Sequence, residues 1–98
     1  MLGNFFKSLF ESRNTTSEQV ADTVQHQGFT IEAAPIDENG KFRTAGYISG
    51  DHAGELKRVR FIRADQHSDL QTATDHAITK AKQIIKEQGP SLLDKDQL

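Results

Sequence analysis

The stretch that decides the fold is Leu56–Gly89, with the sequence LKRVRFIRADQHSDLQTATDHAITKAKQIIKEQG. Its first part alternates charged and apolar residues, which is the period of a half-buried β-strand. Its second part is the one long segment of the chain with a helical period. The stretch therefore predicts a strand followed by a helix that packs across the sheet to which the strand belongs.

Two shorter segments upstream alternate in the same way and predict two more strands, at Phe29–Ala33 and Lys41–Ser49. Between them, Asn39 and Gly40 can adopt the positive φ angles of a hairpin turn. Gly50–Glu55 is expected to be the next turn. Short connections favour sequential antiparallel pairing, so the three strands are predicted to form a meander.

The predicted helix begins with a capping box, in which Ser68 and Gln71 exchange hydrogen bonds, and it closes at Gly89. Its core stripe is Leu70, Ala73, Ala77, Ala81 and Ile84, flanked by Ile78 and Ile85. The predicted fold class is α+β: a three-stranded antiparallel β-meander with one long C-terminal α-helix packed on one face, in the order β-β-β-α. A short amphipathic segment precedes it.

Residues 1–12 are predicted to form that amphipathic segment, residues 13–23 a linker, residues 24–93 a single α+β domain and residues 94–98 a tail. The segment carries an apolar stripe at helical spacing: Leu2, Phe5, Phe6, Leu9 and Phe10. We expect this stripe to be an interaction surface that packs on its own domain or on a sister subunit. A membrane is the less favoured target, because interfacial helices usually carry more cations than the single Lys7.

The sheet needs cover on both faces. Tyr47-Ile48 and Phe61-Ile62 are adjacent apolar pairs, and neighbouring strand residues point to opposite faces. One helix covers only one face. The other is expected to be covered by the N-terminal stripe, by a second subunit in a homodimer or by another partner.

Composition excludes several classes of function. The chain of 98 residues has no cysteine and a formal net charge of −2, which excludes disulfides and gives no global attraction to nucleic acid. No apolar run approaches the roughly 18–20 residues that span a bilayer, and the N-terminus lacks the features of a signal peptide. We expect a cytoplasmic protein.

No constellation of catalytic residues is visible, so we predict no enzyme, no cofactor and no metal. The four histidines are scattered without metal-ligand spacing. His67 lies near Asp65 and Asp69 and could ligand a metal, but residues of this kind before a helix are more often caps. We favour capping.

A basic cluster is the better candidate site. Residues 41–63 contain six basic and two acidic residues, a net charge of +4 in an otherwise acidic chain. The candidate nucleic-acid-binding residues are Lys41, Arg43, Tyr47, Lys57, Arg58, Arg60 and Arg63. A sheet backed by a helix can present such side chains to a duplex. The alternative is that the arginines pair with acidic neighbours such as Glu32 and Asp65 and cover the sheet with their aliphatic stems.

The chain resembles the small bacterial HlyU-type family in three blocks: GFTIEAAPIDENGKFRTAGYIS at residues 28–49, FIRAD at residues 61–65, and the helix AxxxAxxKAKQIIxEQG at residues 73–89. The opening FFKSLF is similar as well. The family is labelled a transcriptional activator, which implies a non-enzymatic regulatory role and DNA or a transcription-associated protein as partner. The resemblance is not to winged-helix regulators, since the sequence contains one convincing helix and no helix-turn-helix.

Three alternatives remain open from the sequence. If Ser17–Gln25 were helical, the order α-β-β-β-α would be that of a double-stranded-RNA-binding domain, although SDLQTA offers its helix start no cation for phosphate. The order strand-strand-strand-helix of sheet-type DNA readers is the second analogy. The third is a protein-interaction or structural module, homo-oligomeric and without nucleic-acid contact.

Overall fold

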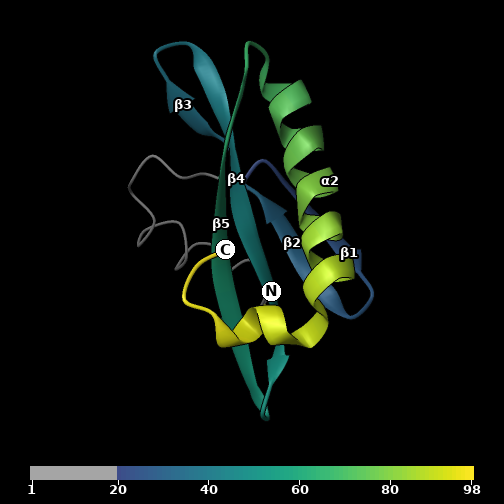
Figure 1. The fold of residues 1–98 in the computed structure, drawn as a ribbon. Coiled ribbons are helices and arrows are strands. Elements are labelled where there is room, and N and C mark those ends of the chain that lie inside the picture. Colours follow the sequence, from purple (N-terminus) through teal and green to yellow (C-terminus); the bar gives the residue numbers. More distant parts are fainter. Residues whose placement is uncertain (1–19) are drawn as a thin grey trace, which may run out of the picture.

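The computed structural model describes residues 20–98, which form one antiparallel sheet with a helical layer on one face (Figure 1). The sheet has five strands, β1 (Asp22–His26), β2 (Phe29–Ala33), β3 (Ile36–Glu38), β4 (Lys41–His52) and β5 (Glu55–His67). The helical layer consists of α2 (Leu70–Gln88) and the 3-10 helix η1 (Gly89–Asp94). The predicted α+β class is confirmed.

The prediction of three strands is wrong, because β1 and β3 add two short ones. β1 pairs with β2, and β2 pairs with residues 46–49 of β4. β3 pairs with residues 41–43 of β4, on the same edge as β2, and β5 occupies the other edge. Asp22 and Thr23, expected in a linker, therefore belong to the sheet, and the double-stranded-RNA-binding order is excluded because residues 22–26 are not helical.

Two-residue turns make the three hairpins. The central pairs are Gln27-Gly28, Asn39-Gly40 and Ala53-Gly54, and all six residues have positive φ. Positive φ at both central positions gives a backbone twist that matches the twist of the flanking strands. The hairpin at Asn39-Gly40 is confirmed. The turn expected over Gly50–Glu55 is shorter, because β4 continues through His52.

The core lies between the sheet and the helical layer. On the sheet side it contains Ile31, Ile48, Val59 and Phe61, each at most 1% exposed. The helix contributes mainly small residues, among them Ala73, Ala77 and Ala81, which are fully buried. Small side chains let α2 approach the sheet closely, and Leu92 and Leu93 of η1 close the lower end of the core.

Gly46 marks the tightest point of this packing. A methyl group at this position would collide with the backbone carbonyl oxygen of Glu32 and would lie 2.9 Å from Cζ of Phe61. The backbone of β4 therefore passes directly beneath the Phe61 ring, and only glycine leaves enough space there.

The start of α2 differs from the predicted capping box. Asp69 is the N-cap, and its carboxylate accepts hydrogen bonds from the Thr72 amide and hydroxyl at 2.8 Å. The hydrogen bond from the Thr72 hydroxyl lowers the pKa of the Asp69 carboxyl, and the hydrogen bond from the Thr72 amide adds a smaller effect in the same direction. The helix begins one residue later than a Ser68 cap would place it, and Leu70, expected in the core stripe, is 46% exposed.

Candidate interaction surface

The surface of interest is the sheet face turned away from α2, here called the far face. Its central residues are Glu32, Arg43, Tyr47, Arg58, Arg60 and Ile62. Tyr47 of β4 pairs with Glu32 of β2 and Arg60 of β5, and paired residues of antiparallel strands share a face. Ile48, Val59 and Phe61 alternate with the far-face residues along the strands and are buried under α2. The side chains of the far-face residues therefore point away from α2.

Arg58 is held in the middle of the far face by two contacts. Its Nε donates to Oε1 of Glu32 at 2.8 Å, and its guanidinium lies 3.8 Å from the centroid of the Tyr47 ring. The Arg58 and Glu32 side chains are 36% and 19% exposed, so the ion pair is partly shielded from water. The contact fixes a planar cation over an aromatic face, an arrangement typical of arginine at recognition surfaces.

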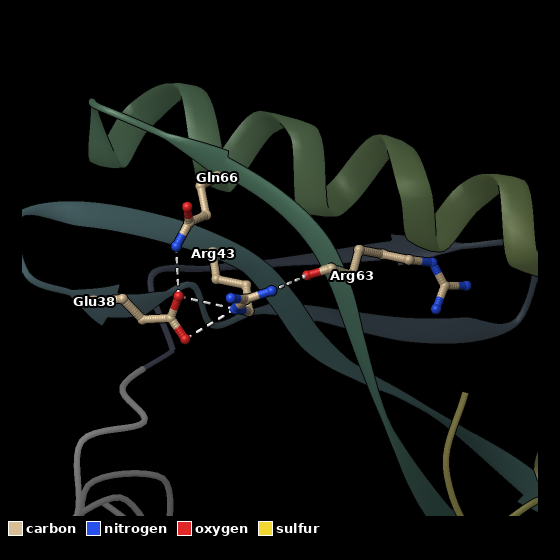
Figure 2. A network of polar contacts seen from close by, with 4 residues as sticks. All are labelled: Glu38, Arg43, Arg63 and Gln66. Carbon is tan, nitrogen blue, oxygen red and sulfur yellow. Dashed lines mark hydrogen bonds and ion pairs between the residues drawn. The ribbon is translucent and has the colours of Figure 1, made fainter.

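A second network joins β3, β4 and β5 (Figure 2). The Nε of Arg43 lies 2.9 Å from both carboxylate oxygens of Glu38, and Gln66 donates to the same carboxylate at 2.6 Å. Arg43 also donates to the backbone carbonyl of Arg63 at 3.3 Å. The hydrogen bond between Arg43 and Glu38 lowers the pKa of Glu38 and raises that of Arg43, so both groups stay charged near neutral pH.

Five of the seven predicted nucleic-acid-binding residues share the far face by strand alternation, and they are Lys41, Arg43, Tyr47, Arg58 and Arg60. Lys57 does not, because it pairs with Gly50 on the covered side. Arg63 does not either, since its guanidinium donates to the carbonyls of Ile62 and Leu98 at the outer edge of β5. Figure 2 shows the Arg63 side chain pointing away from Arg43.

Of the two acidic residues predicted to pair with arginines, one does so in the structure. Glu32 pairs with Arg58 as expected, whereas Asp65 lies 2.9 Å from Nε2 of His76 on α2 and pairs with no arginine in the described contacts. Glu38 was missed, because β3 was not recognised and the residues just before Asn39-Gly40 were predicted to belong to the turn. Leu2, Phe5, Phe6, Leu9 and Phe10, the other predicted surface, lie outside the described residues.

A second polar cluster joins β5 to α2. The hydrogen bond from His76 lowers the pKa of Asp65, and the ring of His67 lies 4.8 Å from that of His76. Nε2 of His67 is buried without a hydrogen-bond partner. Within residues 20–98 no group of three or more histidine, aspartate or glutamate side chains is arranged to hold a metal ion.

These features define a small α+β domain with a one-sided helical layer and an arginine-rich second face. Within residues 20–98, α2 is the only α-helix, so the described part contains no helix-turn-helix, and none of its helices is long and apolar enough to cross a membrane. The family model described as Transcriptional activator HlyU matches residues 4–93, and the chain therefore belongs to the HlyU family. No curated protein and no solved structure matches the chain.

Proposed function

We propose that this chain is a non-enzymatic regulatory protein of the cytoplasm that acts by binding DNA or a transcription-associated protein through the far face. The observation that carries the proposal is the placement of Tyr47, Arg58 and Arg60 side by side across β4 and β5. The family description, which names a transcriptional activator, favours a partner of this kind.

The far face has the chemistry that a nucleic acid requires. Arginine guanidinium groups bind phosphate through paired N–H donors, and a tyrosine ring offers a stacking surface. Lys41 lies beside Glu38 at the end of the same face, next to the Asn39-Gly40 turn, and extends the positive strip along β4. A groove of duplex DNA can accept a β-sheet face of this type.

The test is binding to random-sequence duplex DNA as the salt concentration is raised. We expect weak binding at low salt that falls steeply as salt rises, because each phosphate contact releases a counterion. Arg58→Glu/Arg60→Glu should abolish it. The matched control is Lys82→Glu/Lys86→Glu, which makes the same change of charge on exposed residues of α2. Equal losses in both double variants, or no binding at low salt, would exclude DNA.

A protein-interaction module without nucleic-acid contact is the second candidate, and one observation favours it. Two of the arginines on the far face already share their charge with Glu38 and Glu32, and the half-buried Ile62 lies on the same face. Such a mixed surface suits a protein partner or a second copy of the chain. Light scattering over a range of concentrations distinguishes the second copy, since a homodimer would dissociate on dilution and would lose affinity in Ile62→Asp.

A further inference from the structure

The outer edge of β5, the edge not paired with β4, receives residues 96–98 of the same chain. Gln97 forms a parallel bridge with Arg60, and the Leu98 amide donates to the Arg60 carbonyl at 2.8 Å. Residues 94–98, expected to be a tail, therefore return to the sheet. The contact is a single isolated bridge, in which Gln97 runs parallel to β5.

Arg63 and the core hold this segment in place. Nη1 of Arg63 donates to the Leu98 carbonyl at 2.8 Å and to the Ile62 carbonyl at 3.2 Å, so one guanidinium joins the segment to the strand. The Leu98 side chain packs against the hydrophobic core. Main-chain hydrogen bonds for affinity and a pocket for an alternate side chain are the two elements by which sheet edges recognise extended peptides.

Within residues 20–98, the segment contacts only a small part of the outer edge of β5. β5 has 13 residues, and the bridge involves Arg60 alone. The opposite edge of the sheet is less suited to strand addition: β1 has five residues, and Asp22 occupies the Thr23 amide with its own carboxylate at 2.9 Å. Edge strands that are long and lightly covered accept other strands.

We propose that the outer edge of β5 between Arg60 and Arg63 is a strand-addition site, occupied in cis by Gln97 and Leu98. Its ligand is an extended segment of another polypeptide that runs parallel to β5. A leucine-like side chain takes the place of Leu98, and Arg63 binds the backbone carbonyl of that residue. A segment of five or more residues would pair with more of β5 than the resident one does, and would displace it. The site uses the backbone of Arg60 and Ile62, whose side chains belong to the far face, but it does not depend on the function proposed there.

The test uses two opened variants, in which the resident segment is removed or its hydrogen bond to β5 is lost. The first variant ends at Lys95 and lacks the resident segment. The second is Leu98→Pro, which removes the Leu98 amide that donates to the Arg60 carbonyl and leaves the rest of the chain intact. Lys95→Ala is the control, since it changes an exposed side chain of the same segment. Circular dichroism establishes that each variant is folded.

The probe is a synthetic peptide with the sequence of Asp94–Leu98, titrated at millimolar concentration into labelled protein and followed by NMR chemical shifts. Both opened variants should bind it at least about tenfold more tightly than the full chain and the control do, because the apparent affinity of the full chain is the intrinsic affinity multiplied by the fraction of time that the resident segment leaves the site open. Shifts should centre on Arg60–Arg63. Self-association of the opened variants through β5 would also support the site, with a second copy as occupant.

Equal binding by the opened and the full-length proteins would overturn the proposal, as would the absence of both peptide binding and self-association in the opened variants. A peptide with proline in place of its leucine serves as the negative probe. If that peptide binds as well as the original, the contact is not strand addition.

Discussion

The two faces of the sheet are built from the same strands but differ in the chemistry and burial of their side chains. On the covered face, Ile48, Val59 and Phe61 are at most 1% exposed and meet a helix surface built of alanines. On the far face, their immediate neighbours Tyr47 and Arg58 form a cation–π contact with each other, and Arg58 forms an ion pair with Glu32 in a partly exposed position. The difference teaches that the covered face determines the fold through shape and apolar burial, whereas the far face carries groups suited to binding. The following predictions test this division.

The largest effect is expected from removing a side chain on the covered face. Phe61→Ala should lower the free energy of unfolding by about 3–5 kcal/mol, because it leaves a cavity under α2 that cannot collapse fully. Ile62→Ala, the neighbouring residue on the far face, should cost about 1 kcal/mol or less, since Ile62 is only half-buried. Urea denaturation measures both. Equal losses would mean that the far face is packed as tightly as the core.

Adding a methyl group to the covered face tests whether its packing tolerates extra volume. Gly46→Ala should destabilise the protein by about 1–3 kcal/mol, because the new methyl meets a backbone carbonyl that cannot move away. Gly50→Ala is the matched control on the same strand. Its nearest neighbours are side-chain atoms of Phe29 and Leu93 at 3.0 and 3.4 Å, which can shift, so its cost should be smaller. A harmless Gly46→Ala would contradict the close approach of β4 to Phe61.

On the far face, the ion pair should contribute little to stability. A double-mutant cycle of Glu32→Ala and Arg58→Ala should give a coupling free energy of about 0.2–1 kcal/mol, decreasing as salt is added, because both side chains remain partly exposed. The pair Glu32→Ala and Lys82→Ala is the control and should show no coupling. A coupling well above this range would assign the ion pair a structural role instead of a binding one.

The smallest effect concerns pH. The hydrogen bond from His76 lowers the pKa of Asp65 in the folded state, so this carboxylate stabilises the fold above its ordinary pKa near 4. That contribution is lost as the pH falls through the lowered pKa. Urea midpoints measured from pH 6 to pH 3 should therefore decline less steeply in Asp65→Asn than in the parent. Glu38→Gln tests the equivalent pair on the far face, where Arg43 lowers the pKa of the carboxyl.

The sequence predicted the features that follow from a clear period or a specific turn. Alternation along residues 56–64 placed Val59, Phe61 and Arg63 on one side and Arg58, Arg60 and Ile62 on the other. The structure agrees for all of them except Arg63, whose guanidinium lies at the outer edge of β5. The helix, its alanine stripe and the hairpin at Asn39-Gly40 were predicted for the same reason. The need for a second layer on the far face remains a prediction.

Features without a periodic signal were missed. β1, with the sequence DTVQH, contains a single apolar residue, and β3 has only three residues. Gly28 was the one clue to the extra hairpin between β1 and β2, because Gln27 is not a residue that usually adopts positive φ. Without β3, the pairing of Glu38 with Arg43 could not be predicted. The contact of Arg63 with Leu98 joins residues 35 positions apart and has no local signature.

The three two-residue turns also bear on how the chain reaches its fold. Each one lets a strand find its partner among the residues that immediately follow it, a search that takes on the order of microseconds for a hairpin. Among the pairings of β1 to β5, only that of β2 with β4 must cross an intervening strand. We therefore expect rapid assembly of the sheet in stopped-flow refolding, with α2 docking last onto strands that are already paired. The long β5 would then have its inner edge covered soon after it leaves the ribosome, which shortens the time in which a nascent chain can aggregate.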